Sequence, residues 1–357
     1  MRAAILTAVD RPLELEDLQT PVLGPHDVRV DLEASGVCHS DLTMCSGGVP
    51  SLLPIVLGHE GAGRVAEIGS AVTRVKLGDR VVASFTPTCG RCWHCLRDES
   101  HLCSDLSGTF TPRGTRPDGT AVPGMSGLGT FCEQLTVPQD FVVTVRTDLP
   151  SEQLALIGCG ATTGLGAALN TARVTPGASV AVLGAGGVGL FTIMGAVLAG
   201  ASRVIAVDPL AVKRDAARTV GATDLIDPAD GGTVEQIRAL TRGRGVDYCF
   251  EVVGAPQVIT EAVAATRRGG TTVLVGMPAM GETVTLPAFG LFFDAKTIVG
   301  CNYGSARVRT DFQRWVDLIE SGRLDFSGVI SRRYPLSDVN TALDDLRQGT
   351  VLRGVLT

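Results

Sequence analysis

The sequence has no excess of positive charge. Its 37 aspartate and glutamate residues outnumber its 31 lysine and arginine residues, which gives a formal net charge of −6. Without a basic surface, nucleic acid is not the expected partner. The first residues also lack an apolar run with a small-residue cleavage site, so we expect no secretory signal and a cytoplasmic, reducing environment. In such an environment, clustered cysteines bind metals or act in catalysis more often than they form disulfides.

One long stretch has no charged residue at all. Residues 174–202 are numerous enough to span a bilayer. Their first half, however, contains the short β-branched run SVAVL, and glycines separate this run from a helical pattern. We therefore expect a strand, a glycine turn and a buried helix, and no contact with a membrane.

The length of the chain and the change in its sequence pattern predict two domains. A chain of 357 residues with 45% hydrophobic content exceeds one ordinary core. Residues 1–160 read as an irregular β-rich domain, because short alternating runs are broken by glycine and proline. Residues 161–302 alternate apolar strands with helical patterns, such as the helix expected over 257–269, which predicts an α/β domain with a parallel sheet. Residues 303–357 are expected to return to the first domain.

A dinucleotide fingerprint follows one of the predicted strands. Gly184, Gly186 and Gly189 form a G-x-G-x-x-G pattern between the strand SVAVL and a predicted helix. The three glycines would permit the tight turn, the approach of a pyrophosphate and close helix–strand packing. The next strand ends in Asp208, where a carboxylate can bind both ribose hydroxyls and would repel a 2′-phosphate. NAD is therefore favoured over NADP, against the alternative of a structural turn with a solvated aspartate.

Residues 89–103 carry four cysteines with the spacing C-x2-C-x2-C-x7-C. Four thiolates complete the tetrahedral shell of a structural zinc ion. An iron–sulfur cluster is the main alternative, because it also takes four cysteines at compact spacing. A redox pair would need only two of them. His94 and His101 within the loop are interpreted as exposed polar residues.

A second set of metal-binding residue types is scattered along the chain. Cys38, His59 and Cys159 lie in three separate segments, each flanked by glycine. Two thiolates and one imidazole could hold a zinc ion with an open fourth position. Spacing cannot show that they converge, and each residue alone could be an ordinary core residue.

Taken together, these motifs resemble one known family. GVCHSD, GHEGAG, the four-cysteine loop, GCGATTG, GAGGVG and VIAVD occur along the whole chain in the order found in the zinc-dependent medium-chain alcohol dehydrogenases. The resemblance implies an α/β protein with a GroES-like β-rich catalytic domain, residues 1–160 and 303–357, whose lobe 89–103 holds a structural zinc. It also implies a Rossmann domain, a doubly wound parallel sheet that binds NAD, over residues 161–302.

The resemblance also implies the roles of individual residues. Cys38, His59 and Cys159 would hold a catalytic zinc, and a second, structural zinc would be held by Cys89, Cys92, Cys95 and Cys103. Glu60 is a possible alternate zinc ligand, Asp41 would orient the histidine, and Ser40 would take the alcohol proton. The cofactor would be bound by Gly184, Gly186, Gly187, Val188, Gly189, Asp208, Lys213, His39, Thr163, Val275 and Arg353. Phe85, Met277 and residues near Met125 would line the substrate cleft. The remaining cysteines, Cys45, Cys132, Cys249 and Cys301, are interpreted as small buried hydrophobic residues.

By the same resemblance, the expected activity is reversible hydride transfer between a primary or aromatic alcohol and NAD. Oxidation of a formaldehyde–thiol adduct is the alternative within enzymes, and it would use Arg113 and Arg116 as cations. From another class, the chain could be a dinucleotide-binding protein without catalysis, although every expected catalytic residue is present. A zinc-free, NADPH-dependent quinone reductase is disfavoured by the cysteines and by Asp208. Members of the family form dimers or tetramers, so we expect a homo-oligomer.

One departure from the family generates a prediction. Where many members carry a histidine that relays the proton to solvent, this chain has Thr43. We therefore expect the pH–rate profile to lack the titration of an imidazole, whose ordinary pKa is about 6.5. Substitution Thr43→His should change kcat near neutral pH. Steady-state rates between pH 5 and 9 test this, and an unchanged profile in the variant would contradict it.

Overall fold

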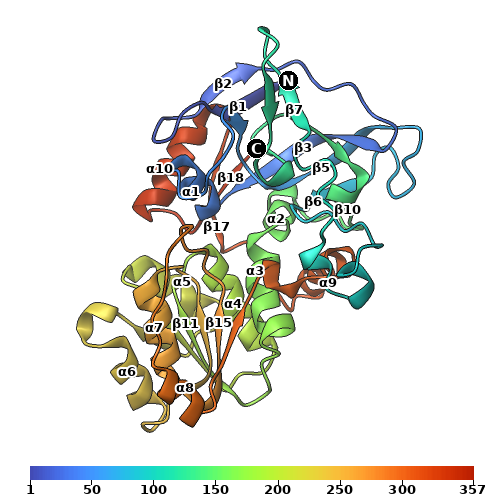
Figure 1. The fold of residues 1–357 in the computed structure, drawn as a ribbon. Coiled ribbons are helices and arrows are strands. Elements are labelled where there is room, and N and C mark those ends of the chain that lie inside the picture. Colours follow the sequence, from blue (N-terminus) through green and yellow to red (C-terminus); the bar gives the residue numbers. More distant parts are fainter. The chain divides into compact units, whose positions relative to one another are not determined.

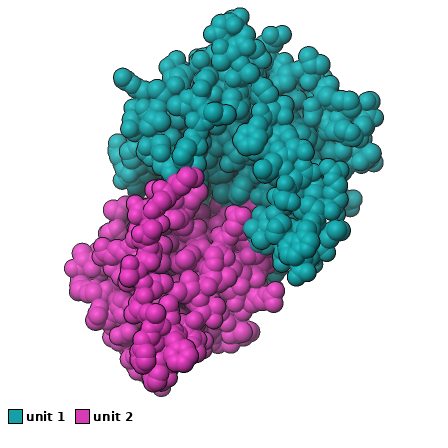
Figure 2. All heavy atoms as spheres, viewed as in Figure 1, with its two compact units in different colours: residues 1–159, 307–357 teal, residues 160–306 magenta.

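The computed structural model describes residues 1–357, which divide into two compact units. Unit 1 comprises residues 1–159 and 307–357, and unit 2 comprises residues 160–306 (Figure 2). Figure 1 shows unit 1 as mainly β-structure and unit 2 as a sheet flanked by helices.

Unit 1 is built around one long strand, β3 (Asp27–Val37). Its first half alternates, with Val28 and Val30 buried and Arg29 and Asp31 turned away from the core, while Ala34–Val37 are buried without alternation. The strand pairs antiparallel with β5, β9 and β18 along different parts of its length. Strand β3 therefore carries the chain from the surface to a fully enclosed end, directly before Cys38.

The seven-stranded sheet of unit 1 has the order β10-β6-β5-β3-β18-β17, and β9 also pairs with β3. The bounds of its other strands are β10 Val142–Thr144, β6 Arg80–Ala83, β5 Glu60–Ile68, β18 Arg353–Leu356, β17 Ile330–Tyr334 and β9 Gln134–Pro138. A smaller sheet contains β2 (Glu14–Asp17), β1 (Arg2–Leu6) and β4 (Ile55–Val56) in this order. A second one pairs β7 (Pro112–Thr115) with β8 (Ala121–Pro123). The helices of this unit are α1 (His39–Cys45), α2 (Ser151–Ile157), α9 (Val308–Glu320) and α10 (Val339–Gln348), with short 3-10 turns η1 (Cys95–Arg97), η2 (Ser100–Leu102), η3 (Met125–Gly127), η4 (Gln139–Phe141) and η8 (Leu336–Asp338).

Unit 2 contains one parallel sheet of six strands in the order β13-β12-β11-β14-β15-β16. Numbered from β11, this is the order 3-2-1-4-5-6 of a doubly wound dinucleotide-binding sheet. The strands are β11 (Ser179–Leu183), β12 (Arg203–Val207), β13 (Asp224–Ile226), β14 (Val246–Glu251), β15 (Thr266–Leu274) and β16 (Thr297–Gly300). The helical segments are α3 (Gly160–Gly166), the π-helix η5 (Ala167–Thr171), α4 (Gly187–Leu198), α5 (Ala211–Thr219), η6 (Pro228–Asp230), α6 (Thr233–Leu240), α7 (Pro256–Ala265), α8 (Ala288–Phe293) and η7 (Tyr303–Ser305).

The charge-free stretch 174–202 forms β11, a glycine turn and the twelve-residue helix α4. No single helix of the chain is long and apolar enough to cross a membrane. One bent pair of helices, Ser151–Ile157 with Gly160–Thr171, meets the requirements for a membrane span in length and composition only.

One predicted helix ends earlier than its pattern suggests. The pattern extended over 257–269, but α7 ends at Ala265 and the following residues begin β15. Thr266 is the reason, because it pairs in register with Val246 and its hydroxyl bonds to Thr272 at 2.8 Å. Sheet pairing therefore overrides the local helical pattern at this point.

Candidate active site

Four side chains with metal-binding atoms meet in unit 1. Cys38 follows the last residue of β3, His59 and Glu60 lie at the start of β5, and Cys159 lies two residues beyond the end of α2. Their ligand atoms all lie within 4.8 Å of one another, and all four residues are buried. The fold therefore brings together the scattered residues that the sequence predicts to share a zinc ion.

Asp41 holds this group in shape through three contacts. Its Oδ2 accepts a hydrogen bond from the backbone N–H of Cys38 at 2.9 Å, and its Oδ1 accepts one from that of Gly58 at 3.1 Å. The same Oδ1 lies 3.3 Å from Nδ1 of His59. Because Asp41 is completely buried, these contacts are not weakened by solvent. One carboxylate thus fixes two segments that supply ligand atoms and orients the imidazole.

The remaining nitrogen of His59 has no partner. Its Nε2 is buried and makes no hydrogen bond, while Nδ1 faces Asp41. A buried polar atom without a partner is rare in a native protein. An orphaned imidazole nitrogen within 4.8 Å of two cysteine sulfurs is the donor set that zinc takes. The residues present therefore fit a zinc ion at this site.

The surroundings of Cys38 favour the thiolate that a metal ion binds, whereas those of His59 favour the protonated imidazole. A hydrogen bond from Cys159 lowers the pKa of the Cys38 thiol well below its ordinary value, although burial acts in the opposite direction. Burial lowers the pKa of His59, but the Asp41 carboxylate outweighs this effect and leaves that pKa well above its ordinary value. The enclosed group thus favours a thiolate at Cys38.

Glu60 is paired with Arg353 across the central strand. Glu60 begins β5 and Arg353 begins β18, and these two strands flank the end of β3 near Gly36. The guanidinium Nη2 contacts Glu60 Oε2, and both side chains are buried. A Cβ at position 36 would collide with this carboxylate, so a side chain there would have to displace Glu60 from its place beside Arg353. This role of Gly36 was not predicted, although the glycine is the first residue of the motif GVCHSD.

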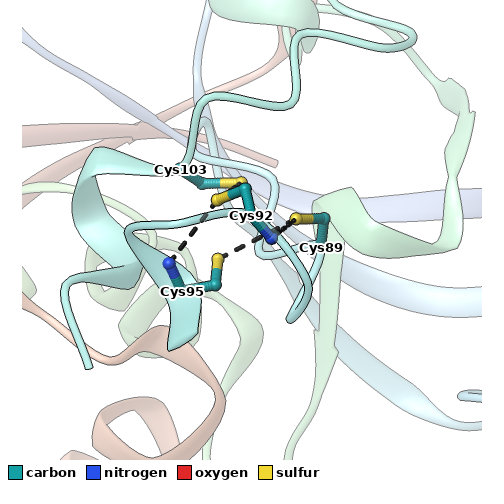
Figure 3. A group of neighbouring side chains, drawn as sticks. All are labelled: Cys89, Cys92, Cys95 and Cys103. Carbon is teal, nitrogen blue, oxygen red and sulfur yellow. Dashed lines mark hydrogen bonds between the residues drawn. The ribbon is translucent and has the colours of Figure 1, made fainter. Parts of the chain in front are cut away.

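The four cysteines of the second group converge within one loop (Figure 3). The Sγ atoms of Cys89 and Cys95 are 4.0 Å apart, and those of Cys92 and Cys103 are 3.9 Å apart. A tetrahedral zinc with Zn–S bonds of about 2.3 Å requires sulfurs about 3.8 Å apart, so the set fits this ion. Backbone hydrogen bonds from Cys95 and Ser104 lower the pKa of Cys92 to about 5, which favours the thiolate that binds metal.

The glycine fingerprint forms a turn in unit 2. Gly184 has φ +98°, which favours glycine, and a Cβ at Gly189 would collide with the carbonyl of Gly184. A Cβ at Gly186 would meet nothing within 4 Å, so the turn leaves open space where a pyrophosphate would lie. Asp208, at the end of β12, accepts a hydrogen bond from the N–H of Ala185 at 2.9 Å and is 5% exposed. The turn and the acid are thus linked directly, and the residues fit a dinucleotide.

The other predicted residues lie in the following places. In unit 1, Ser40 is half-buried with Oγ 3.9 Å from Cys38 Sγ, His39 is exposed, and the Phe85 ring packs edge-on against His59 with centroids 6.0 Å apart. Met125 of the same unit is buried in the core.

In unit 2, Gly187 and Val188 belong to the first turn of α4. Three other predicted residues of this unit are half-buried, namely Thr163, Lys213 and Val275, and Met277 is exposed. Arg353, predicted to bind the cofactor, is 2% exposed and paired with Glu60.

The two arginines considered for an anionic substrate are occupied. Arg113 is 1% exposed, and its guanidinium donates to the carbonyls of Thr136, Gly108 and Gly127. Arg116 forms a two-pronged ion pair with Glu16. Both guanidinium groups are thus engaged by other groups of the protein.

The other cysteines and the loop histidines also have defined surroundings. Cys45, Cys132, Cys249 and Cys301 are buried, as the sequence predicts. His94 and His101 are only half-buried rather than exposed, and Nδ1 of His94 lies 3.1 Å from Glu99.

The contacts of Asp41 generate a prediction. Asp41→Asn replaces an oxygen that accepts hydrogen bonds with an amide group, so the imidazole and the Cys38 loop lose part of their support. We expect zinc affinity to fall about 10- to 100-fold, the usual effect of removing a partner of a metal ligand. Competition with a zinc chelator measures the affinity. Asp31→Asn, on the exposed part of β3, is the matched control, and equal affinities in the two variants would contradict the assignment.

Comparison with known proteins agrees with this arrangement. Residues 24–147 match the family model of the alcohol dehydrogenase GroES-like domain, and residues 187–321 match that of the zinc-binding dehydrogenase. An NDMA-dependent alcohol dehydrogenase of Amycolatopsis methanolica is 38% identical over 99% of this chain and 98% of its own length. An S-(hydroxymethyl)glutathione dehydrogenase of Synechocystis is 36% identical over 99% of each chain.

A solved structure shares both the fold and the sequence pattern. The crystal structure of a benzyl alcohol dehydrogenase from Acinetobacter calcoaceticus superimposes with a TM-score of 0.93 at 32% identity, over 99% of this chain and 98% of the other. The predicted fold class and the resemblance noted in the sequence are thereby confirmed. The chain is an oxidoreductase that belongs to the zinc-dependent medium-chain alcohol dehydrogenase family.

Proposed function

We propose that the protein is an NAD-dependent zinc alcohol dehydrogenase that interconverts a primary or aromatic alcohol and its aldehyde. The observation that carries this proposal is the buried meeting of Cys38, His59 and Cys159 around an unpartnered imidazole nitrogen. In this proposal, unit 1 is the catalytic unit and unit 2 binds the cofactor.

The choice of NAD rests on Asp208. Its carboxylate is held beside the glycine turn by the N–H of Ala185, where it can accept the hydroxyls of an adenosine ribose. A 2′-phosphate at the same place would be repelled by this carboxylate, which its hydrogen bond to Ala185 holds in position. Lys213, in the first turn of α5, is proposed as a second contact near this ribose.

Zinc and NAD would supply the reactive chemistry, and the side chains of the protein would hold the ion and transfer the proton. When bound, zinc supplies Lewis acidity to the alcohol oxygen, and NAD accepts the hydride from the alcohol carbon at C4 of its nicotinamide. Cys38, His59 and Cys159 would hold the ion, and Asp41 keeps the imidazole in one orientation. Ser40, next to Cys38, would receive the hydroxyl proton and pass it to water. Thr43 cannot continue this transfer as an imidazole would, and its hydroxyl donates to the carbonyl of His39.

The substrate class is inferred from apolar surroundings. Phe85 packs against the metal-binding imidazole, so an apolar or aromatic substituent would find a partner there. The similar benzyl alcohol dehydrogenase is named for an aromatic alcohol. A formaldehyde–thiol adduct is the second candidate, because one relative is an S-(hydroxymethyl)glutathione dehydrogenase. Its charged groups would need a cation, and Arg113 and Arg116 are both engaged elsewhere.

The proposed function is tested by measuring zinc and activity together. We expect about two zinc ions per chain and reduction of NAD with benzyl alcohol, with NADP at least about tenfold less efficient. Cys38→Ala should remove one zinc and lower kcat/KM about a thousandfold or more, because Lewis-acid stabilisation is worth several kcal/mol.

Cys45→Ala is the matched control, since Cys45 is a buried cysteine at the other end of α1 that belongs to no metal-binding group. Activity that survives in Cys38→Ala, or equal use of NADP, would contradict the proposal. Activity found only with formaldehyde and a low-molecular-weight thiol would favour the second candidate.

We also propose that two copies of the chain associate through unit 2. The edge strand β16 has a sheet neighbour on one side only, and α8 lies directly before it in sequence. Helix α8 exposes Phe289, Phe292 and Phe293 at 76%, 82% and 58%. An exposed edge with three aromatic rings is an unusual surface for a monomer. A two-fold axis beside β16 would pair it antiparallel with its copy and cover the rings.

Phe292→Asp tests this interface. A charge at the centre of an apolar contact should dissociate the oligomer, because the carboxylate would be desolvated without a partner. Light scattering after gel filtration should then give a mass near the 37.1 kDa of one chain. Leu52→Asp, at an exposed apolar position of unit 1, is the control. An unchanged mass for Phe292→Asp would reject this surface as the interface.

A further inference from the structure

Glu251 occupies a position that the proposed chemistry does not use. It is the last residue of β14, between β11, which leads into the glycine fingerprint, and β15. In the parallel register, Glu251 is opposite Leu183 on one side and Leu274 on the other. Ligands of open α/β sheets bind at the carboxyl ends of the strands, and Glu251 is buried there with no exposed surface.

This one residue binds four backbone N–H groups of two loops. Its side-chain Oε1 accepts hydrogen bonds from Val253 at 2.8 Å and Gly254 at 2.7 Å. Its own carbonyl accepts from Val275 at 2.8 Å and Gly276 at 3.0 Å. The turn after β14 and the loop after β15 are therefore both attached to Glu251.

The two loops are packed without free space. Gly254 has φ +83°, and a Cβ there would lie 2.6 Å from the carbonyl oxygen of Met277. A Cβ at Gly276 would collide with the backbone N of Gly254. A Cβ at Gly184, the first glycine of the fingerprint, would lie 2.8 Å from Cγ2 of Val253. The side chain of Val253 is thus placed against the nucleotide turn, while 53% of the residue remains exposed.

The carboxyl group is bound on one oxygen only. Oε2 is buried and has no hydrogen-bond partner. Burial raises the pKa of Glu251, and the groups that act against this effect are the backbone N–H groups of Gly254, Val253 and Ala255. No cation neutralises the acid, so it is retained in this apolar place for its acceptor oxygen. A buried acid without an ion-pair partner is costly for stability alone, which points to a functional reason for it.

We propose that Glu251 is a positioning residue for the dinucleotide. By holding the N–H groups of Val253 and Gly254, its carboxyl oxygen sets the turn 252–255 in the one shape that presents Val253 beside Gly184. This inference rests on the proposed function, because it takes the fingerprint turn as the place where the nucleotide binds. The proposal gives Glu251 no part in binding the metal ion or in the transfer of the hydride.

Three variants separate this role from a structural one. Glu251→Gln keeps an acceptor oxygen of the same length and should bind NADH within about threefold of the unchanged protein. Glu251→Ala removes the acceptor and should weaken NADH binding and raise KM for NAD about tenfold, a change of about 1.4 kcal/mol, with kcat at saturating NAD within about twofold. Glu251→Asp, one methylene shorter, should lie between them and serves if the alanine variant fails to fold.

Cys249→Ala is the matched control for lost packing. Cys249 lies two residues earlier on the same strand, is equally buried, and belongs to the core of unit 2. It should lower Tm without changing NADH affinity. Fluorescence titration with NADH, thermal unfolding and zinc content are measured for every variant.

The outcomes distinguish this inference from the proposed function. If the unchanged protein fails to bind NADH, the proposed function fails and not the role of Glu251 alone. If it binds NADH and Glu251→Ala (or Glu251→Asp) binds equally well, the positioning role is wrong. If Glu251→Gln loses as much affinity as Glu251→Ala, an acceptor oxygen is not what matters, and the proposal is overturned. If Cys249→Ala loses affinity in step with Tm, the effect is general destabilisation and the proposal is likewise rejected.

Discussion

The chemistry of this protein depends on enclosing polar groups that water would otherwise satisfy. Unit 1 buries two thiols, an imidazole and a carboxylate within a few ångströms of one another, which is costly unless each group is paired. Asp41 pairs with His59 and with two backbone N–H groups, and Arg353 pairs with Glu60. The imidazole nitrogen that a metal ion would take, Nε2 of His59, remains unpaired. The burial of these groups therefore favours a metal ion as much as the sulfur and nitrogen atoms themselves do.

Glycine makes this enclosure possible at several places where chains approach closely. Gly36 lets the carboxylate of Glu60 cross the end of β3 to reach Arg353, and Gly189 lets α4 approach the turn at Gly184. Gly254 and Gly276 do the same for the two loops bound by Glu251. In each case a single Cβ would collide with an atom of the neighbouring segment. The 44 glycines of the chain thus include positions that serve the sites directly.

Both units bind buried acids through backbone N–H groups, and unit 1 adds a cation at one of them. In unit 1 the buried acids have cationic or N–H partners, as Asp41 and Glu60 illustrate. In unit 2, Asp208 and Glu251 are both held by backbone N–H groups of the loops that they organise. Backbone donors orient an acid without adding a counter-charge. The same device at Glu251 serves only to shape a turn.

Local patterns in the sequence were sufficient for the features that depend on neighbours along the chain. The strand, glycine turn and helix around Gly184, the acid at the end of β12 and the four-cysteine loop each lie within a short segment, so spacing alone predicted them. The convergence of Cys38, His59 and Cys159 came from resemblance, because no spacing rule relates segments so far apart. Tertiary structure alone decided the pairing of Glu60 with Arg353, the burial of Arg113, the early start of β15 at Thr266 and the attachment of two loops to Glu251. Each of these depends on sheet pairing or on burial between distant segments, and neither is encoded in the residues of one segment.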